Sequence, residues 1–176
     1  MIQIEWNEKK LNSFYNKMDK IAVNVKKGSL AGIKKATEET QKLALQLKRG
    51  SNKGILIELL DTNTNKIKGR VYTDSKNFPY LVYLEFGTGI YADPEGGGSR
   101  AKRIPWYVHV SMADLSRYGY PVYTSPFTGE KFYVVAGAHP HPYMRPAGFK
   151  MRDKNVEIIR TAIQEMIKEA VKWYTN

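Results

Sequence analysis

The chain has 176 residues, no Cys, 42% hydrophobic residues and a net charge of +11 at pH 7. This length predicts one domain of ordinary size, and the hydrophobic content is sufficient for a folded core. Without Cys, the chain cannot form a disulfide scaffold, an iron–sulfur cluster, a Cys-ligated zinc site or a thiol nucleophile. No apolar run is long enough to span a bilayer, and the first residues lack a signal-peptide pattern. We therefore expect a protein made in the cytoplasm, with no membrane partner.

The positive charge is concentrated in two blocks of the sequence. Residues 1–53 carry 12 basic and 5 acidic side chains, and residues 100–152 carry 8 and 2, whereas residues 54–99 carry 4 and 6. Such a charge distribution attracts polyanions such as DNA, but it also attracts acidic protein surfaces. Charge alone therefore does not choose between these two kinds of partner.

Residues 7–49 have the periodicity of an amphipathic helix. The apolar side chains fall on one helical face, and most of the lysines, with Lys27, Lys34 and Lys35 among them, fall on the opposite face. The first basic block is thus predicted to be a stripe along the outside of a helical segment.

A straight helix of this length would be long for a compact domain. It would extend about 60 Å, whereas a domain of this size has a radius of gyration of about 16 Å. We therefore expect two consecutive helices or one kinked helix. Gly28, Ser29 and Gly32 are the expected breakpoint, because Gly in a helix interior costs about 1 kcal/mol relative to Ala.

Residues 54–86 are predicted to form a β-hairpin and part of the core. The runs GILIELLD and KIKGRVYTD flank a turn-rich segment at residues 62–65, which is the pattern of two strands joined by a turn. Residues 78–86 are mostly apolar, and their periodicity does not distinguish a short helix from a strand.

Residues 87–137 contain many Gly and Pro residues and are predicted to be an insertion of loops and hairpins, with short aromatic pieces at 106–110 and 131–136. Residues 153–173 have a helical apolar face, with Asp153 as the expected N-cap. Helices at both ends of a set of strands indicate an α+β fold. We expect an antiparallel sheet packed against a long or kinked N-terminal helical segment and a C-terminal helix, in a single domain.

No motif points to catalysis or to a cofactor. The His139-Pro-His141 segment lacks a nearby carboxylate, so we interpret it as a structured loop and not as a metal site. Glu85 is the one acid in an apolar run. We interpret it as an anchor that pairs with Arg or with backbone N–H groups, because no partner acid or His lies nearby in the sequence. We therefore expect a protein that is not an enzyme and that uses no cofactor or metal.

Two short segments carry a resemblance to a known family. Residues 83–89 read YLEFGTG and residues 141–147 read HPYMRPA, and residues 100–107 between them read RAKRIPWY. In this order, and between two helical segments, they resemble the minor neck proteins of tailed bacteriophages, which are called head–tail joining or tail-completion proteins. Tyr143 stands where Phe is usual in that family.

The resemblance implies a structural virion protein of a tailed phage or prophage. Such a protein completes the tail, or joins it to the head, as a subunit of a ring around the DNA path. Its implied partners are further copies of itself, the tail tube, neck or connector proteins, and genome DNA bound without sequence preference. Its implied location is the tail or neck of the virion. The alternative is a basic protein that binds nucleic acid nonspecifically.

Two sets of residues follow from the resemblance and the charge pattern. The expected structural hub for assembly consists of Tyr83, Glu85, Phe86, Gly87, Thr88, Pro142, Tyr143, Met144, Arg145 and Pro146. The expected contacts with the DNA channel or with an acidic partner are Lys27, Lys34, Lys35, Arg100, Lys102 and Arg103. If the two hub segments meet in space, we expect Glu85 and Arg145 to form a charge-assisted pair.

Overall fold

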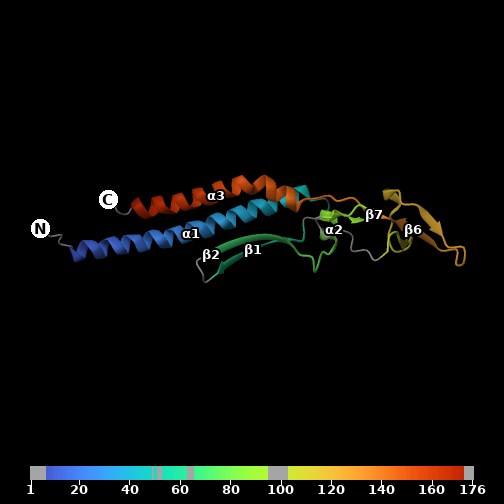
Figure 1. The fold of residues 1–176 in the computed structure, drawn as a ribbon, viewed down its shortest axis with the longest axis horizontal. Coiled ribbons are helices and arrows are strands. Elements are labelled where there is room, and N and C mark those ends of the chain that lie inside the picture. Colours follow the sequence, from blue (N-terminus) through green and yellow to red (C-terminus); the bar gives the residue numbers. More distant parts are fainter. Residues whose placement is uncertain (1–6, 49, 51–52, 63–65, 95–102, 173–176) are drawn as a thin grey trace. The chain divides into compact units, whose positions relative to one another are not determined.

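The structure is a computed structural model of the chain, and it describes residues 7–48, 50, 53–62, 66–94 and 103–172. The elements follow in the order α1, β1, β2, α2, β3, β4, η2, β5, β6, β7 and α3 (Figure 1). The predicted α+β class is confirmed.

Contacts within the chain group its residues into two compact units, and each is described by itself. Unit 1 consists of Met1–Gln46, Ile55–Tyr72 and Pro146–Asn176, and unit 2 consists of Leu47–Gly54 and Thr73–Arg145. The single-domain expectation stays a prediction, because such a grouping does not say whether either unit folds on its own.

Unit 1 is built around α1 (Glu8–Leu47), a helix of 40 residues. The expected division into two helices is wrong, because α1 continues through Gly28 and Gly32. Both glycines are buried against α3 (Met144–Lys172). A Cβ atom on Gly28 would lie 2.9 Å from the carbonyl oxygen of Ala162, and one on Gly32 would lie 2.8 Å from the Cα of Ile159. Glycine therefore permits close approach of two helix backbones, and this packing offsets its poor helix propensity.

The predicted hairpin is confirmed. Strands β1 (Ile55–Thr62) and β2 (Lys66–Thr73) form a two-stranded sheet. The Gln41 side chain of α1 donates a hydrogen bond of 2.6 Å from Nε2 to the carbonyl oxygen of Ile55. Gly69 of β2 packs so closely on α1 that a Cβ atom there would collide with the side chains of Ile33 and Thr37.

The helix predicted at residues 153–173 begins nine residues earlier than expected. Because α3 starts at Met144, Asp153 lies inside the helix, and its prediction as an N-cap is wrong.

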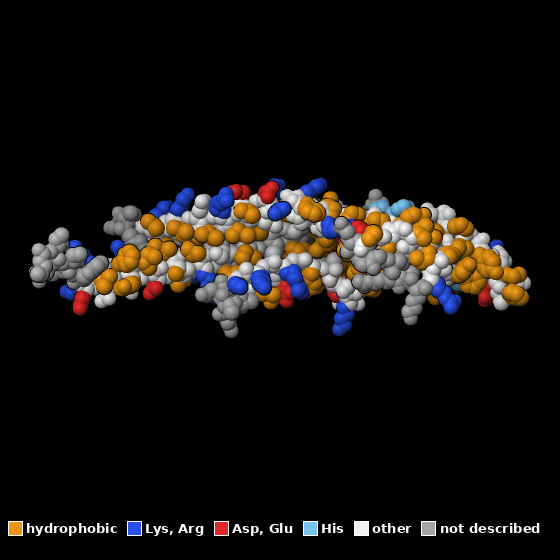
Figure 2. Space-filling model, in the orientation of Figure 1, with side chains coloured by type: hydrophobic (Ala, Val, Ile, Leu, Met, Phe, Trp, Pro, Cys, Tyr) orange, Lys and Arg blue, Asp and Glu red, His pale blue; other side chains and the backbone are white. Residues whose placement is uncertain are grey.

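The N-terminal part of α1 exposes a row of large apolar side chains, which Figure 2 shows as hydrophobic side chains gathered along that helix. Within the described part of the chain, no helix is both long enough and apolar enough to cross a membrane.

Unit 2 contains one short helix and two small sheets. Helix α2 (Tyr80–Phe86) resolves the ambiguity of residues 78–86. Strand β3 (Thr88–Gly89) pairs in antiparallel fashion with β7 (Gly137–Ala138). The segment predicted as loops and hairpins contains a three-stranded antiparallel sheet, in which β4 (Trp106–His109) and β5 (Val122–Thr124) both pair with a central β6 (Lys131–Val135). The 3₁₀ turn η2 (Ser116–Tyr118) precedes β5.

Candidate assembly hub

Helix α2 directs one acidic side chain into the interior of unit 2. Leu81 and Glu85 are four residues apart and therefore lie on the same helical face. They are the two buried residues of α2, with 0% and 3% of their surface exposed. A buried carboxylate is unfavourable unless it is hydrogen-bonded, so its partners determine what this residue does.

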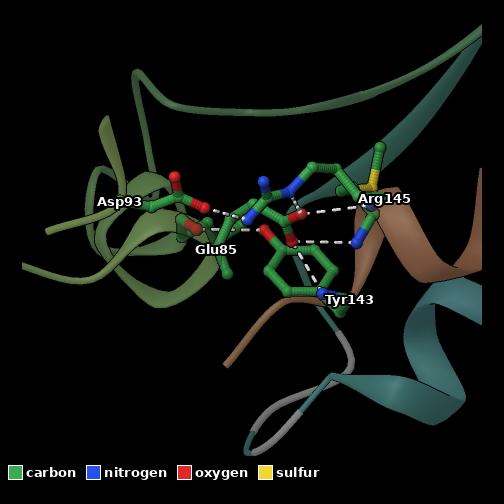
Figure 3. A network of polar contacts seen from close by, with 6 residues as sticks. Glu85, Asp93, Tyr143 and Arg145 are labelled. Carbon is green, nitrogen blue, oxygen red and sulfur yellow. Dashed lines mark hydrogen bonds and ion pairs between the residues drawn. The ribbon is translucent and has the colours of Figure 1, made fainter. Parts of the chain in front are cut away.

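The carboxylate of Glu85 caps the start of α3 (Figure 3). Its Oε2 accepts hydrogen bonds from the backbone N–H groups of Tyr143, at 2.6 Å, and Met144, at 2.9 Å, and its Oε1 accepts one from Arg145, at 3.1 Å. The first N–H groups of a helix have no partner within the helix. The next residue is Pro146, which has no N–H group. Glu85 therefore satisfies the free donors of the first turn, and its negative charge interacts favourably with the helix dipole.

Arg145 completes the network around this carboxylate, and the predicted pairing with Glu85 is confirmed. Its Nε donates to Glu85 Oε1 at 3.3 Å, and its Nη2 donates to Asp93 Oδ2 at 2.7 Å. The guanidinium also lies over the ring of Phe86, 5.0 Å from its centroid. The hydrogen bond to Asp93 is the main cause that raises the pKa of Arg145, and the charge of Asp93 and the pairing with Glu85 add to it. Sequence reasoning missed Asp93, because no motif marks it.

Tyr143 fills the space beside Glu85. Its side chain is fully buried, and its hydroxyl donates a hydrogen bond of 3.2 Å to the carbonyl oxygen of Leu81. Burial, followed by the negative charge of Glu85, raises the pKa of Tyr143 well above its usual value. The hydroxyl of Tyr143 is therefore hydrogen-bonded within the core of unit 2.

Further contacts join residues 84–88 to residues 138–141. Gly87 ends α2 with a φ of 73°, and a Cβ atom there would lie 2.8 Å from the carbonyl oxygen of Ala138. Glycine is therefore favoured at this position for two reasons, because it adopts the positive φ and because a side chain would not fit. The Oγ1 of Thr88 accepts a hydrogen bond of 2.9 Å from the N–H of Ala138, and the N–H of His141 donates one of 2.7 Å to the carbonyl oxygen of Leu84.

The structure thus brings together most of the residues expected in the hub. We define the hub as Glu85, Phe86, Asp93, Tyr143, Met144 and Arg145, which contact one another. Gly87 and Thr88 instead contact Ala138, three residues before His141. Tyr83 and Pro142 are exposed, and Pro146 follows within the first turn of α3.

The predicted basic contacts are surface side chains. Lys27, Lys34 and Lys35 are exposed on α1 in unit 1, and Arg103 is exposed in unit 2. Arg100 and Lys102 lie outside the described residues. The role of these basic residues stays a prediction.

The histidines have local partners. The ring of His139 lies against that of Tyr91, with centroids 3.8 Å apart, and His109 Nδ1 lies 2.6 Å from Ser111 Oγ. Among the described residues, His, Asp and Glu form no group of three or more that could hold a metal ion.

The chemistry of the hub is structural. Glu85 is engaged by three backbone N–H groups and one guanidinium, so its carboxylate holds α2, the segment at Asp93 and the start of α3 in one arrangement. Comparisons of the chain with family models, with curated proteins and with solved structures found no match.

Proposed function

We propose that the protein is a structural virion component of a tailed phage or prophage. In this proposal it completes the tail or joins it to the head as one subunit of a ring around the DNA path. Its partners are further copies of itself, the tail tube, neck or connector proteins, and the genome as it passes through the ring.

The observation that carries the proposal is the hub. The two segments on which the family resemblance rests are far apart in the sequence, at residues 83–89 and 141–147, yet they meet through Glu85 in unit 2. Two motifs that serve one structural purpose are expected to contact each other in the folded chain, whereas two accidental sequence matches have no reason to do so.

The exposed apolar side chains support an assembling protein. In unit 1, Phe14 and Tyr15 are more than half exposed, and in unit 2, Met112 and Phe127 are 80% and 96% exposed. Exposed apolar surface of this kind is typical of interaction sites. A ring of identical subunits needs two different complementary surfaces on each subunit, and each unit offers one candidate.

Native mass spectrometry with negative-stain imaging tests this proposal directly. We expect the purified protein, alone or when mixed with phage tails that lack it, to form closed rings of defined mass. Gold-labelled protein should bind the head-proximal end of such tails. Protein that stays monomeric under both conditions and labels no end of the tail would contradict the proposal.

A second candidate is nonspecific nucleic-acid binding, which is favoured by the exposed lysines of α1. The two proposals differ in the oligomeric state of the protein that contacts DNA. Tight binding of duplex DNA by monomers at near-physiological salt, without ring formation, would favour the second candidate, because electrostatic binding of this kind needs no assembly.

A further inference from the structure

Strands β1 and β2 of unit 1 form a ribbon that lies along α1 and has two long edges (Figure 1). Each strand has eight residues, and neither contains Pro. In a two-stranded sheet each strand is paired on one side only, so its other side carries backbone N–H and C=O groups without a strand partner. Edge strands of native proteins are commonly protected by short length or by Pro, and this ribbon has neither protection.

The register of the ribbon shows which backbone groups point outward. The N–H of Asp74 donates a hydrogen bond of 2.8 Å to the carbonyl oxygen of Gly54, so these residues lie opposite each other. Counting equally along both strands places Glu58 opposite Arg70, and their ion pair of 3.0 Å agrees with this register. Because the hydrogen bonds of an antiparallel pair alternate along each strand, every second residue directs its N–H and C=O outward. These residues include Ile57 and Leu59 on β1 and Ile67, Gly69 and Val71 on β2.

Most of this outward backbone is uncovered. The carbonyl oxygen of Ile55, which points outward by the same alternation, accepts the hydrogen bond from Gln41 of α1. For the five outward residues just named, the described part of the chain supplies no hydrogen-bond partner beyond the ribbon. An open groove of about 790 Å³ adjoins β2 at Ile67 and its two neighbours. The chain therefore leaves both free donors and space beside β2.

We propose that the β2 edge of one copy pairs with the β1 edge of a second copy, so that neighbouring ribbons form a continuous antiparallel sheet. The inference rests on the proposed function, because it names a contact between the copies in the ring. Such a ring needs two different complementary surfaces on each subunit, and the two edges of one ribbon are such a pair. Strand addition to a free sheet edge is a common mode of association.

The direction of the strands fits this arrangement. Neighbours in a ring of many subunits are related by a small rotation, so β1 of the second copy runs in nearly the same direction as β1 of the first. It is therefore antiparallel to the β2 strand that it meets. The exposed apolar side chains described above would add to this contact and are not needed for the strand pairing.

The charges of the strands favour opposite edges over like edges. Strand β1 contains Glu58 and Asp61 and no basic residue, whereas β2 contains Lys66, Lys68 and Arg70 and no acidic residue. Two β2 edges would bring basic residues together, and two β1 edges would bring acidic residues together. Like charges directly opposite each other on neighbouring strands are destabilising. Pairing of β2 with β1 instead repeats the order of charges that already exists inside the ribbon.

We expect the register of the ribbon to repeat between copies. Gly69 of one copy then lies opposite Leu59 of the second copy, so that outward groups meet outward groups. This register again places a basic residue opposite Glu58, and it leaves the carbonyl oxygen of Ile55 to Gln41. It also places Lys68 opposite Leu60 of the second copy, and both of these side chains are exposed.

Disulfide trapping with the full-length protein tests the proposal, because the chain has no Cys of its own. One preparation carries Leu60→Cys with an affinity tag, and the other carries Lys68→Cys without a tag. Each chain has one thiol, so no disulfide can form within a chain. In the expected contact the two positions form a pair without hydrogen bonds, whose Cα atoms lie about 4.5 Å apart, which is within the range for a disulfide.

After mild oxidation of the mixture, we expect the disulfide-linked heterodimer to exceed each homodimer severalfold. The matched control mixes Arg152→Cys with Lys168→Cys, which are exposed positions on α3, and it measures cross-linking by random collision. Homodimers in excess would mean that like edges pair, and would overturn the proposal.

Native mass spectrometry of the same preparations separates this inference from the proposed function. Closed rings whose heterodimer yield is no higher than that of the control would overturn the edge contact and leave the ring in place. A high yield of heterodimer without closed rings would support the edge contact and contradict the ring. Monomers that give no heterodimer above the control would contradict both.

Hydrogen exchange of the unmodified protein gives a second test that needs no substitution. The outward N–H groups of Leu59, Gly69 and Val71 should exchange severalfold more slowly in the assembled protein than in the monomer. The N–H groups of Glu58 and Arg70, which point into the ribbon, are the internal control and should be protected in both states. Equal exchange of the outward N–H groups in monomer and assembly would overturn the proposal.

Discussion

At the scale of single residues, the first turn of α3 is capped by Glu85, which lies far from that helix in the sequence. A glutamine side chain at this position would keep the shape, but its amide nitrogen cannot accept a hydrogen bond, and the negative charge is lost. We expect Glu85→Gln to lower the free energy of unfolding by about 2–4 kcal/mol, since buried N–H groups and Arg145 lose their partner. Urea denaturation measures this change.

The matched control for that experiment is Glu157→Gln. Glu157 pairs with Arg160 at 2.6 Å, but both side chains are more than half exposed, and exposed pairs contribute little to stability. A loss of stability in Glu85→Gln no larger than that in the control would contradict the capping role assigned to the Glu85 carboxylate.

The hydroxyl of Tyr143 gives a prediction with a defined pH dependence. Its pKa is raised in the folded protein, chiefly by burial, so the unfolded chain loses this proton first, from about pH 10 upward. The unfolded state then binds fewer protons, and the stability contributed by Tyr143 decreases as the pH rises. Tyr143→Phe should therefore be less stable by about 1 kcal/mol near pH 8, through the lost bond to Leu81. This difference should shrink between about pH 9.5 and 11. If urea denaturation gives the same stability difference between the wild-type protein and Tyr143→Phe at every pH, the raised pKa of Tyr143 is contradicted.

At the scale of elements, the glycines of the two long helices should respond in opposite ways to Ala. In α3, a Cβ atom on Gly148 would meet nothing within 4 Å, so Gly148→Ala should stabilise by up to about 1 kcal/mol through helix propensity. In α1, Gly28→Ala and Gly32→Ala gain the same propensity but place a methyl group against the backbone of α3. We expect both to lower the thermal midpoint, and a rise in either would show that the contact between the helices is looser than described.

The same elements show which features local sequence can predict. The apolar face of α1 and the hairpin were predicted because periodicity and turn residues are local signals. The uninterrupted course of α1 could not be predicted, because the contacts that offset Gly28 and Gly32 come from α3, about 130 residues later. The start of α3 was misplaced for a related reason, since its cap is Glu85 and Asp153 was the nearest residue of capping type. Asp93 carries no sequence signal at all.

At the scale of the whole molecule, the net charge of +11 leaves open whether polyanions are attracted by the overall field or by one surface. If Lys27, Lys34 and Lys35 of α1 are the residues that contact the DNA, they should make local contacts with phosphate groups. Each lost phosphate contact reduces the slope of log affinity against log salt concentration by about 0.9. The variant Lys27→Glu, Lys34→Glu and Lys35→Glu should therefore reduce the slope for a duplex by up to about 2.7. In a phage that carries it, the same variant should lower the yield of infectious particles.

The control for this variant carries Arg152→Glu, Lys154→Glu and Lys168→Glu, all exposed on α3. It changes the net charge by the same amount, so an effect of the overall field would appear equally in both proteins. A reduced slope in the α1 variant alone would identify α1 as the surface in contact with phosphate. Equal slopes in the two variants, together with an unchanged particle yield, would mean that the lysine face of α1 does not meet DNA and that its charge serves another contact.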